Sequence, residues 1–81
     1  FLMRQISLSK LLTQQPNLYQ NLTLRVIDKK INEIDEIQQR YLLAQVVLLS
    51  NNYIKDLTAI IQFQQCVTLS LSHNSINSLQ Q

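Results

Sequence analysis

The chain has no glycine, one proline, one cysteine and one histidine in 81 residues. Without glycine it cannot form the glycine-rich loops that cradle phosphate groups in nucleotide-binding proteins. A single cysteine excludes an internal disulfide, and together with a single histidine it leaves too few ligands for a zinc site, which needs about four. We therefore expect no cofactor and no metal.

Charge is also sparse, with seven Lys and Arg against five Asp and Glu, a formal net charge of +2 and no basic run. Nucleic-acid binding usually shows a clustered basic stripe with aromatic platforms, and the sequence has neither. No stretch approaches the roughly 18 to 20 continuous apolar residues of a membrane helix, and residues 1–12 are too polar for a signal-peptide core. We expect neither nucleic acid nor a membrane as a partner, and a reducing intracellular location.

What the chain does contain is a phrase that appears twice, at residues 47–57 and 69–79. Both copies read apolar-x-apolar-Ser-x-Asn-x-Ile-x-x-Leu, and the asparagines Asn52 and Asn74 are 22 residues apart. A more degenerate copy at residues 24–34 keeps the apolar positions but has Lys29 in place of the asparagine. Self-similarity at such a period predicts stacked repeats.

Each copy begins with an apolar pair two residues apart, which predicts a short strand with both side chains on one face. The pairs are Leu24 and Val26, Val47 and Leu49, and Leu69 and Leu71. Apolar residues spaced by three follow, such as Ile76 and Leu79, which suits a turning or helical return path. We expect Phe63, which continues this spacing, and Cys66, which opens the third copy, to lie in the core.

Asn52 and Asn74 come just after their strands, where the chain bends and leaves backbone groups without ladder partners. A buried amide side chain can both donate and accept, whereas an unpaired buried polar group costs roughly 1–3 kcal/mol. We therefore predict a structural asparagine ladder at these two positions.

The 22-residue spacing and the Leu-x-Leu-Ser-x-Asn-x-Ile pattern resemble the leucine-rich repeat family over residues 21–79, most specifically over 44–79. The match is to the short intracellular class typified by the regulatory subunit of protein phosphatase 1 and by repeat proteins of cilia, centrosomes and dynein complexes. The resemblance implies an α/β solenoid with a parallel β-sheet on the concave side and short helices or turns on the convex side. It also implies a cytoplasmic location, with the cytoskeleton, the cilium and the centrosome as settings.

Residues 7–15 read as a short amphipathic helix, with leucines on one face, Ser7 or Ser9 able to cap its start, and Pro16 after its end. We expect an N-terminal helical cap at residues 1–20, then repeats at about 21–43, 44–65 and 66–81, the last incomplete. Repeat arrays need roughly three or more repeats, so the chain reads as a fragment of a longer polypeptide. Residues 27–41 also lie close to helical spacing, so a plain helix there is an alternative.

In the repeat family, the variable positions beside the strand leucines form the concave surface that binds partners. Carried over to this sequence, the partner-binding residues are Arg25, Asp28, Val46, Leu48, Asn51, Tyr53, Ser70 and His73. Leu48, with Val46 beside it and Tyr53 near it, is expected to form an apolar and aromatic spot with a polar rim, as in interface hot regions. The alternative is that a neighbouring segment of the same protein covers Leu48.

Catalysis is not predicted, because the repeat register turns Cys66 into the core and His73 toward the concave rim, so the two do not form a nucleophilic pair. The sequence therefore predicts a non-enzymatic interaction module or scaffold that docks a helix or globular surface of another protein, with no small-molecule substrate. Two alternatives stay open. One is a regulatory subunit that targets a phosphatase or a motor, and the other is a recognition domain appended to an enzyme outside these residues.

Overall fold

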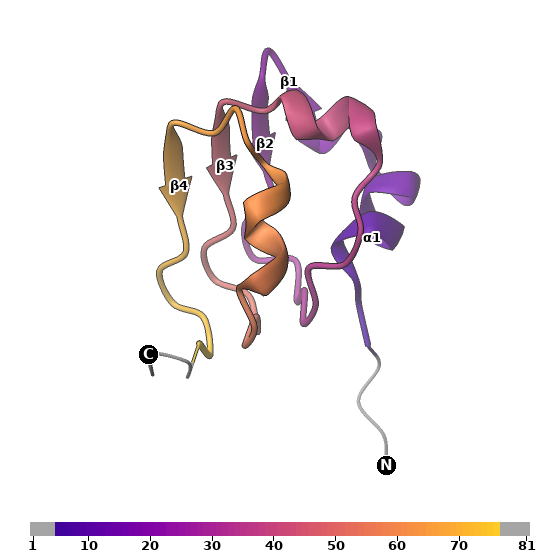
Figure 1. Ribbon diagram of the computed structural model, residues 1–81. Coiled ribbons are helices and arrows are strands. Elements are labelled where there is room, and N and C mark those ends of the chain that lie inside the picture. Colours follow the sequence, from indigo (N-terminus) through magenta and orange to yellow (C-terminus); the bar gives the residue numbers. More distant parts are fainter. Residues whose placement is uncertain (1–4, 77–81) are drawn as a thin grey trace.

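The computed structural model describes residues 5–76 of the chain. The strands lie side by side along one side of the molecule, and the helical segments lie across the core from them (Figure 1). In chain order the elements are α1 (Leu8–Gln14), the 3-10 helix η1 (Pro16–Leu18), β1 (Tyr19–Gln20), β2 (Thr23–Arg25), the 3-10 helix η2 (Gln39–Leu43), β3 (Val46–Leu48), the 3-10 helix η3 (Thr58–Gln62) and β4 (Thr68–Ser70).

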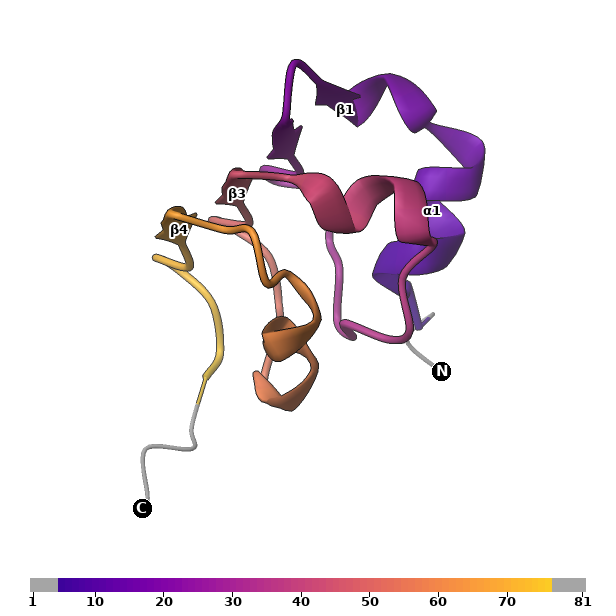
Figure 2. The same ribbon diagram turned by 45° about the horizontal axis from the view of Figure 1, so that its top comes forward.

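The four strands form one mixed sheet in the order β1-β2-β3-β4. β1 and β2 pair antiparallel, whereas β3 pairs with β2 and β4 pairs with β3 in parallel. The parallel register places Leu24 beside Val47 and Val47 beside Leu69, so matching positions of the repeated phrase are neighbours in the sheet. A long connection that contains a 3-10 helix joins each parallel strand to the next (Figure 2).

The predicted fold class, an α/β leucine-rich repeat solenoid, is wrong. The structure is a small compact domain with a radius of gyration of 12.0 Å and extents of 36 × 31 × 19 Å. Its sheet is mixed, because β1 folds back antiparallel onto β2, and α1 is the one α-helix within residues 5–76. Four strands spaced by about 4.8 Å span only about 15 Å. The described chain therefore closes around one core and does not extend along a repeat axis.

The segment between β2 and η2 does not form the helix that the sequence left open as an alternative. Residues 27–38 contain no helix, and Glu33 instead forms a parallel bridge with Ser7. A plain helix over residues 27–41 is therefore wrong. Ile31, Ile34 and Ile37 are nevertheless buried. They are spaced by three residues, and the irregular backbone of this segment turns each of them toward the core.

Helix α1 forms where capping chemistry predicts it. Ser7 is the N-cap, and its hydroxyl accepts a hydrogen bond from the Lys10 amide at 3.3 Å. Asp35 adds a carboxylate at the same end, where it accepts from the Ser9 amide at 2.9 Å and from the Ser9 hydroxyl. Pro16 follows the C-cap Gln15. The negative charge of Asp35 is favourable beside the positive end of the helix.

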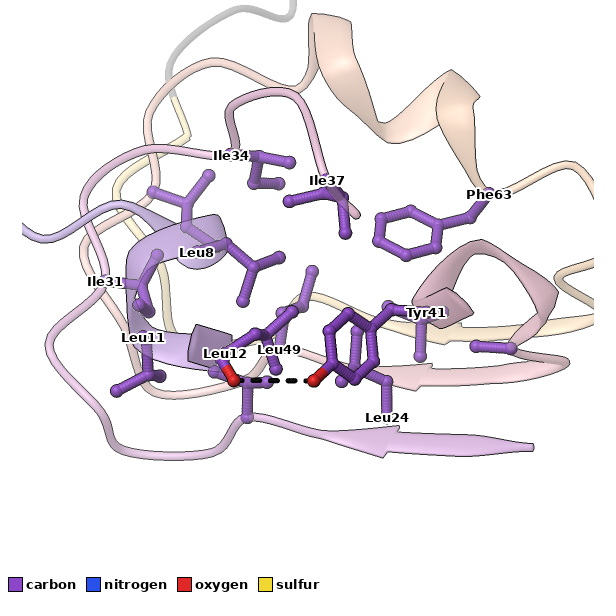
Figure 3. Close-up of a cluster of buried hydrophobic side chains, with 14 residues drawn as sticks. Leu8, Leu11, Leu12, Leu24, Ile31, Ile34, Ile37, Tyr41, Leu49 and Phe63 are labelled. Atoms are coloured by element: carbon purple, nitrogen blue, oxygen red, sulfur yellow. Dashed lines mark hydrogen bonds between the residues drawn. The ribbon is translucent and has the colours of Figure 1, made fainter. Parts of the chain in front are cut away.

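A single cluster of buried side chains joins α1, the sheet and the long connections (Figure 3). The Tyr41 ring meets Tyr19 edge to face with its centroid 5.4 Å away, and its hydroxyl donates to the Leu12 carbonyl oxygen at 3.4 Å. Phe63 is buried, as expected, whereas Cys66 is half-buried at the margin of the cluster. The buried apolar residues are Leu8, Leu11, Leu12, Leu24, Val26, Ile31, Ile34, Ile37, Tyr41, Ala44, Val47, Leu49, Ile54 and Phe63.

Candidate functional site

The side of the sheet that faces away from the core is the main candidate surface. Strand side chains alternate between faces, so the middle residues of β2, β3 and β4 turn inward and the flanking residues turn outward. The register aligns the outward residues in two rows across the strands. We call this surface the outer sheet face; it comprises Thr23, Val46 and Thr68 in one row and Arg25, Leu48 and Ser70 in the other.

The centre of the outer sheet face is apolar and its margins are polar. Val46 and Leu48 on β3 are only half-buried, although they occupy the middle of the surface. Arg25 on one side is exposed, and Ser70 on the other is half-buried. An apolar centre within a polar rim is the usual anatomy of a protein interface.

Three predicted contact residues lie together just after the strands. Asp28, Asn51 and His73 are exposed, and all have left-handed backbone conformations, with φ of 59°, 60° and 58°. The Asp28 amide donates to the Ser50 carbonyl oxygen at 3.2 Å, and the Asn51 amide donates to the Ser72 carbonyl oxygen at 3.0 Å. Asp, Asn and His are among the residue types that tolerate this conformation best. Their identity thus has a structural reason that is independent of any partner.

Tyr53 lies apart from the strands. Its side chain is 49% exposed and lines a pocket of ≈ 290 Å³ with Gln5, Asn32, Lys55 and Ser75. Those neighbours come from turns and connections. The structure therefore places the predicted aromatic contact with the turn residues, whereas Leu48 lies on the sheet.

A second hollow extends the outer sheet face at its β1 end. This pocket, of ≈ 340 Å³, is lined by Thr23 and Arg25 together with Asn17, Leu18, Gln20 and Asn21. The sequence analysis did not predict Asn17, Leu18, Gln20 and Asn21 as surface contacts, because these residues belong to η1 and the β1–β2 hairpin. The hairpin lacks the Asn-Gly or Asp-Gly dipeptide that marks such turns. Asn21, which has a φ of 53° in the turn, is the one residue of the hairpin loop whose type indicates a turn in the sequence.

Asn52 and Asn74 hold adjacent chain segments together. The Asn52 side chain is 4% exposed; its Oδ1 accepts from the Lys29 and Ile31 amides, and its Nδ2 donates to the carbonyl oxygens of Val26, Leu49 and Ser50 at 2.7 to 3.1 Å. Asn74 accepts from the Ile54 amide at 2.9 Å and donates to the Leu49 carbonyl oxygen at 2.9 Å. Both amides act as donor and acceptor, so they are structural residues.

The chemically reactive side chains are dispersed. The Cys66 thiol donates to the Thr68 carbonyl oxygen at 3.2 Å, and His73 is exposed beyond β4. Over residues 5–76, no three His, Cys, Asp or Glu side chains gather in a way that could hold a metal ion. The same residues include no helix with the length and apolar character needed to cross a membrane.

One carboxyl group has a perturbed pKa. The hydroxyl of Thr58 donates to Asp56 Oδ1 at 2.6 Å, and the Thr58 amide donates to the same oxygen at 2.9 Å. These two hydrogen bonds lower the pKa of Asp56 below its ordinary value. Asp56 lies two residues before η3, so these hydrogen bonds stabilise the turn that leads into η3.

Comparisons with protein-family models, with curated proteins and with solved structures found no match. The resemblance to leucine-rich repeats and the assignment of partner-binding residues therefore stay predictions.

Proposed function

We propose that the chain is a non-enzymatic protein-interaction module that binds its partner on the outer sheet face. The observation that carries the proposal is the half-buried apolar pair Val46 and Leu48 at the centre of that face. A large apolar side chain at the middle of a surface with polar margins is where binding energy concentrates.

Arg25 fits the same role. It is exposed beside Leu48 in the register and also lines the hollow near β1. Arginine offers five hydrogen-bond donors in a planar group that stacks on aromatic rings and pairs with carboxylates. A partner that presents an apolar side chain for Leu48 and a carboxylate or carbonyl group for Arg25 suits this surface.

The proposal includes a cytoplasmic location, on the ground that one cysteine cannot supply the disulfides that small extracellular domains commonly use. The two alternatives, a regulatory subunit of a phosphatase or motor and a recognition domain attached to an enzyme, are more specific forms of the proposed interaction module. No side-chain arrangement within residues 5–76 favours either of them.

Capture of partners by the immobilised chain tests the proposal. Leu48→Asp should remove a defined set of proteins from the material bound from an extract of the source cells, as measured by quantitative mass spectrometry. Leu43→Asp is the matched control, because Leu43 is a 57% exposed leucine on η2, away from the sheet. Circular dichroism of both variants should match the parent chain. Equal capture by Leu48→Asp and the parent chain would refute the assignment of this face.

A further inference from the structure

The hollow beside the β1–β2 hairpin is lined almost entirely by side chains that form hydrogen bonds. It carries one guanidinium group, three carboxamide groups and one hydroxyl group, and none of its lining residues is Asp or Glu. In that order the groups belong to Arg25, to Asn17, Gln20 and Asn21, and to Thr23; the remaining lining residue is Leu18. All six lie in one continuous part of the described chain. The hollow therefore presents a positive charge and several donors, with no acidic side chain of its own to satisfy them.

The walls of this hollow are held in place by the rest of the fold. Gln20 of β1 is the register partner of Thr23 of β2. The Leu22 carbonyl oxygen accepts from the Gln45 and Val46 amides at 2.8 and 3.2 Å, which ties the hairpin turn to the start of β3. A ligand thus meets a surface that is already formed, and less conformational freedom is lost on binding.

Arg25 joins the hollow to the outer sheet face. It lines the hollow, and in the register of the sheet it is the neighbour of Leu48. Neighbouring strands lie about 4.8 Å apart, so one short segment of a partner can reach both residues. Arg25 is also the one charged residue among those that form the outer sheet face and the hollow. The charge of the group it binds is therefore set by Arg25 alone.

That single positive charge favours a carboxylate. A guanidinium group and a carboxylate pair through two parallel hydrogen bonds, and their charges cancel. A phosphate monoester brings about two negative charges at pH 7, which one arginine does not neutralise. A neutral amide or backbone carbonyl group accepts a hydrogen bond from Arg25 but gains no charge attraction.

The groups that line the hollow also indicate where the carboxylate comes from. The carboxylate at the end of a chain is commonly captured by backbone amides arranged as a nest. Here the hydrogen-bonding groups belong to side chains, and the strands beside them are paired with each other in the hairpin. An Asp or Glu side chain can enter such a hollow from a chain that continues past it.

We propose that the hollow is a subsite for an acidic side chain, Asp or Glu, of the protein that binds the outer sheet face, and that Arg25 selects it. The inference rests on the proposed function, because the same partner covers Leu48. It adds a requirement to that function: the partner presents an acidic side chain beside an apolar one.

Three short peptides, added to the whole chain at constant ionic strength and followed by NMR, test this assignment. Acetyl-Leu-Ala-Glu-amide has its leucine and glutamate on one side when extended and has no terminal carboxylate. Acetyl-Leu-Ala-Gln-amide is the neutral equivalent, and acetyl-Leu-Ala-Gln with a free carboxyl end offers a terminal carboxylate only. We expect the glutamate peptide to shift the side-chain resonances of Arg25 and Asn21 in a saturable way, with an affinity about tenfold higher than that of either other peptide.

Substitutions of arginine separate this subsite from general attraction to positive charge. Arg25→Gln should weaken binding of the glutamate peptide about tenfold, to the level of the neutral peptide. Arg25→Lys should weaken it less, because lysine keeps the charge but lacks the planar pair of donors. Arg40→Gln is the matched control, since Arg40 is an exposed arginine on η2 that lies over the Tyr41 ring; it should bind as the parent chain does. If backbone amide spectra show that Arg25→Gln is unfolded, Gln20→Ala replaces it, with an expected loss of about threefold.

Three results would overturn the subsite. The glutamate and glutamine peptides could bind equally, the peptide with the free carboxyl end could bind as tightly as the glutamate peptide, or inorganic phosphate could shift the same resonances with higher affinity than the glutamate peptide. Failure of the proposed function gives a different result, which is equal capture of partners by Leu48→Asp and the parent chain. Loss of partners in Leu48→Asp with full capture by Arg25→Gln would keep the outer sheet face as the interface and refute the acidic side chain.

Discussion

At the scale of single residues, Asn52 shows how one buried amide organises several chain segments. It is the buried polar side chain of the described core, and its five hydrogen bonds join the segment after β2 to the residues that directly follow β3. Asn74 makes the same kind of contacts but is only half-buried. Three of the five hydrogen bonds of Asn52 are buried, whereas those of Asn74 are half-buried or exposed.

We therefore expect Asn52→Leu to lower the free energy of unfolding by about 3 kcal/mol and Asn74→Leu by about 1 kcal/mol. Urea unfolding followed by circular dichroism measures both. Gln64→Ala is the control, because Gln64 is exposed, and it should change stability little. Equal losses from all three substitutions would contradict the structural role of the asparagines.

Asp56 gives a prediction about pH. The hydroxyl of Thr58 is the larger cause of its lowered pKa, ahead of the Thr58 amide. Thr58→Val removes the hydroxyl and keeps the amide, so the pKa of Asp56 should rise part of the way to its ordinary value. An NMR titration of the Asp56 carboxyl carbon measures this shift.

The sign for stability follows from the direction of the pKa shift. A carboxyl whose pKa is lower in the folded state stabilises the fold above its unfolded pKa and loses that contribution as pH falls through the folded pKa. The parent chain should thus lose more stability on acidification than Thr58→Val. An unchanged Asp56 pKa in the variant would show that the hydroxyl has no part in the shift.

At the scale of elements, the β1–β2 hairpin uses a conformation that suits glycine in a chain without glycine. Its two turn residues, Asn21 and Leu22, have φ of 53° and 61°, the pattern of a type I′ turn. Asparagine adopts a left-handed conformation readily, but leucine does so at a cost of roughly 1–2 kcal/mol.

Leu22→Gly should consequently stabilise the chain by about 1 kcal/mol, since it relieves the backbone more than it loosens the unfolded state. Thermal unfolding measures the change. Leu43→Gly replaces another exposed leucine, one without positive φ, and should destabilise. A loss of stability in Leu22→Gly would contradict the turn geometry.

Helix α1 depends on a residue far away in the sequence. Asp35 binds Ser9 at the first turn of α1, and the Gln38 side chain donates to the Ser9 carbonyl oxygen at 3.0 Å. Asp35→Ala should therefore destabilise the helix by about 1 kcal/mol. Hydrogen exchange at the Leu11 and Leu12 amides should accelerate about fivefold to tenfold.

The control for that measurement is Glu36→Ala, which removes a neighbouring exposed carboxylate. It should leave exchange in α1 unchanged. The same exchange rates in both variants would show that Asp35 does not anchor the helix.

At the scale of the whole molecule, one core joins α1 to the sheet. Leu12 on α1 and Leu49, just after β3, are both 0% exposed members of the same cluster. A shared core predicts a single cooperative unfolding transition, whereas units that fold separately would unfold in steps.

Leu12→Val and Leu49→Val should each lower the free energy of unfolding by about 1 kcal/mol, since each removes one buried methylene group. Both substitutions should move the entire transition, with far-ultraviolet circular dichroism and tyrosine fluorescence giving the same midpoint. Leu43→Val is the exposed control. Divergent midpoints in Leu12→Val would indicate that α1 unfolds apart from the sheet.

The sequence by itself predicts the local features of this protein. The apolar pairs predicted where the parallel strands lie, the serine cap and the following proline predicted α1, and the asparagines after the strands predicted the side-chain amides that bond to the backbone there. These signals succeed because side-chain periodicity and capping act over a few residues.

Only the tertiary structure decided the fold class, the hairpin at β1 and the separate position of Tyr53. Each depends on which distant segments meet, and backbone pairing across a sheet has no local code. The outer sheet face lies between these cases. Its residues follow from strand alternation, but the half-buried state of Val46 and Leu48 at its centre depends on how the rest of the described chain packs around the sheet, which the sequence does not encode locally.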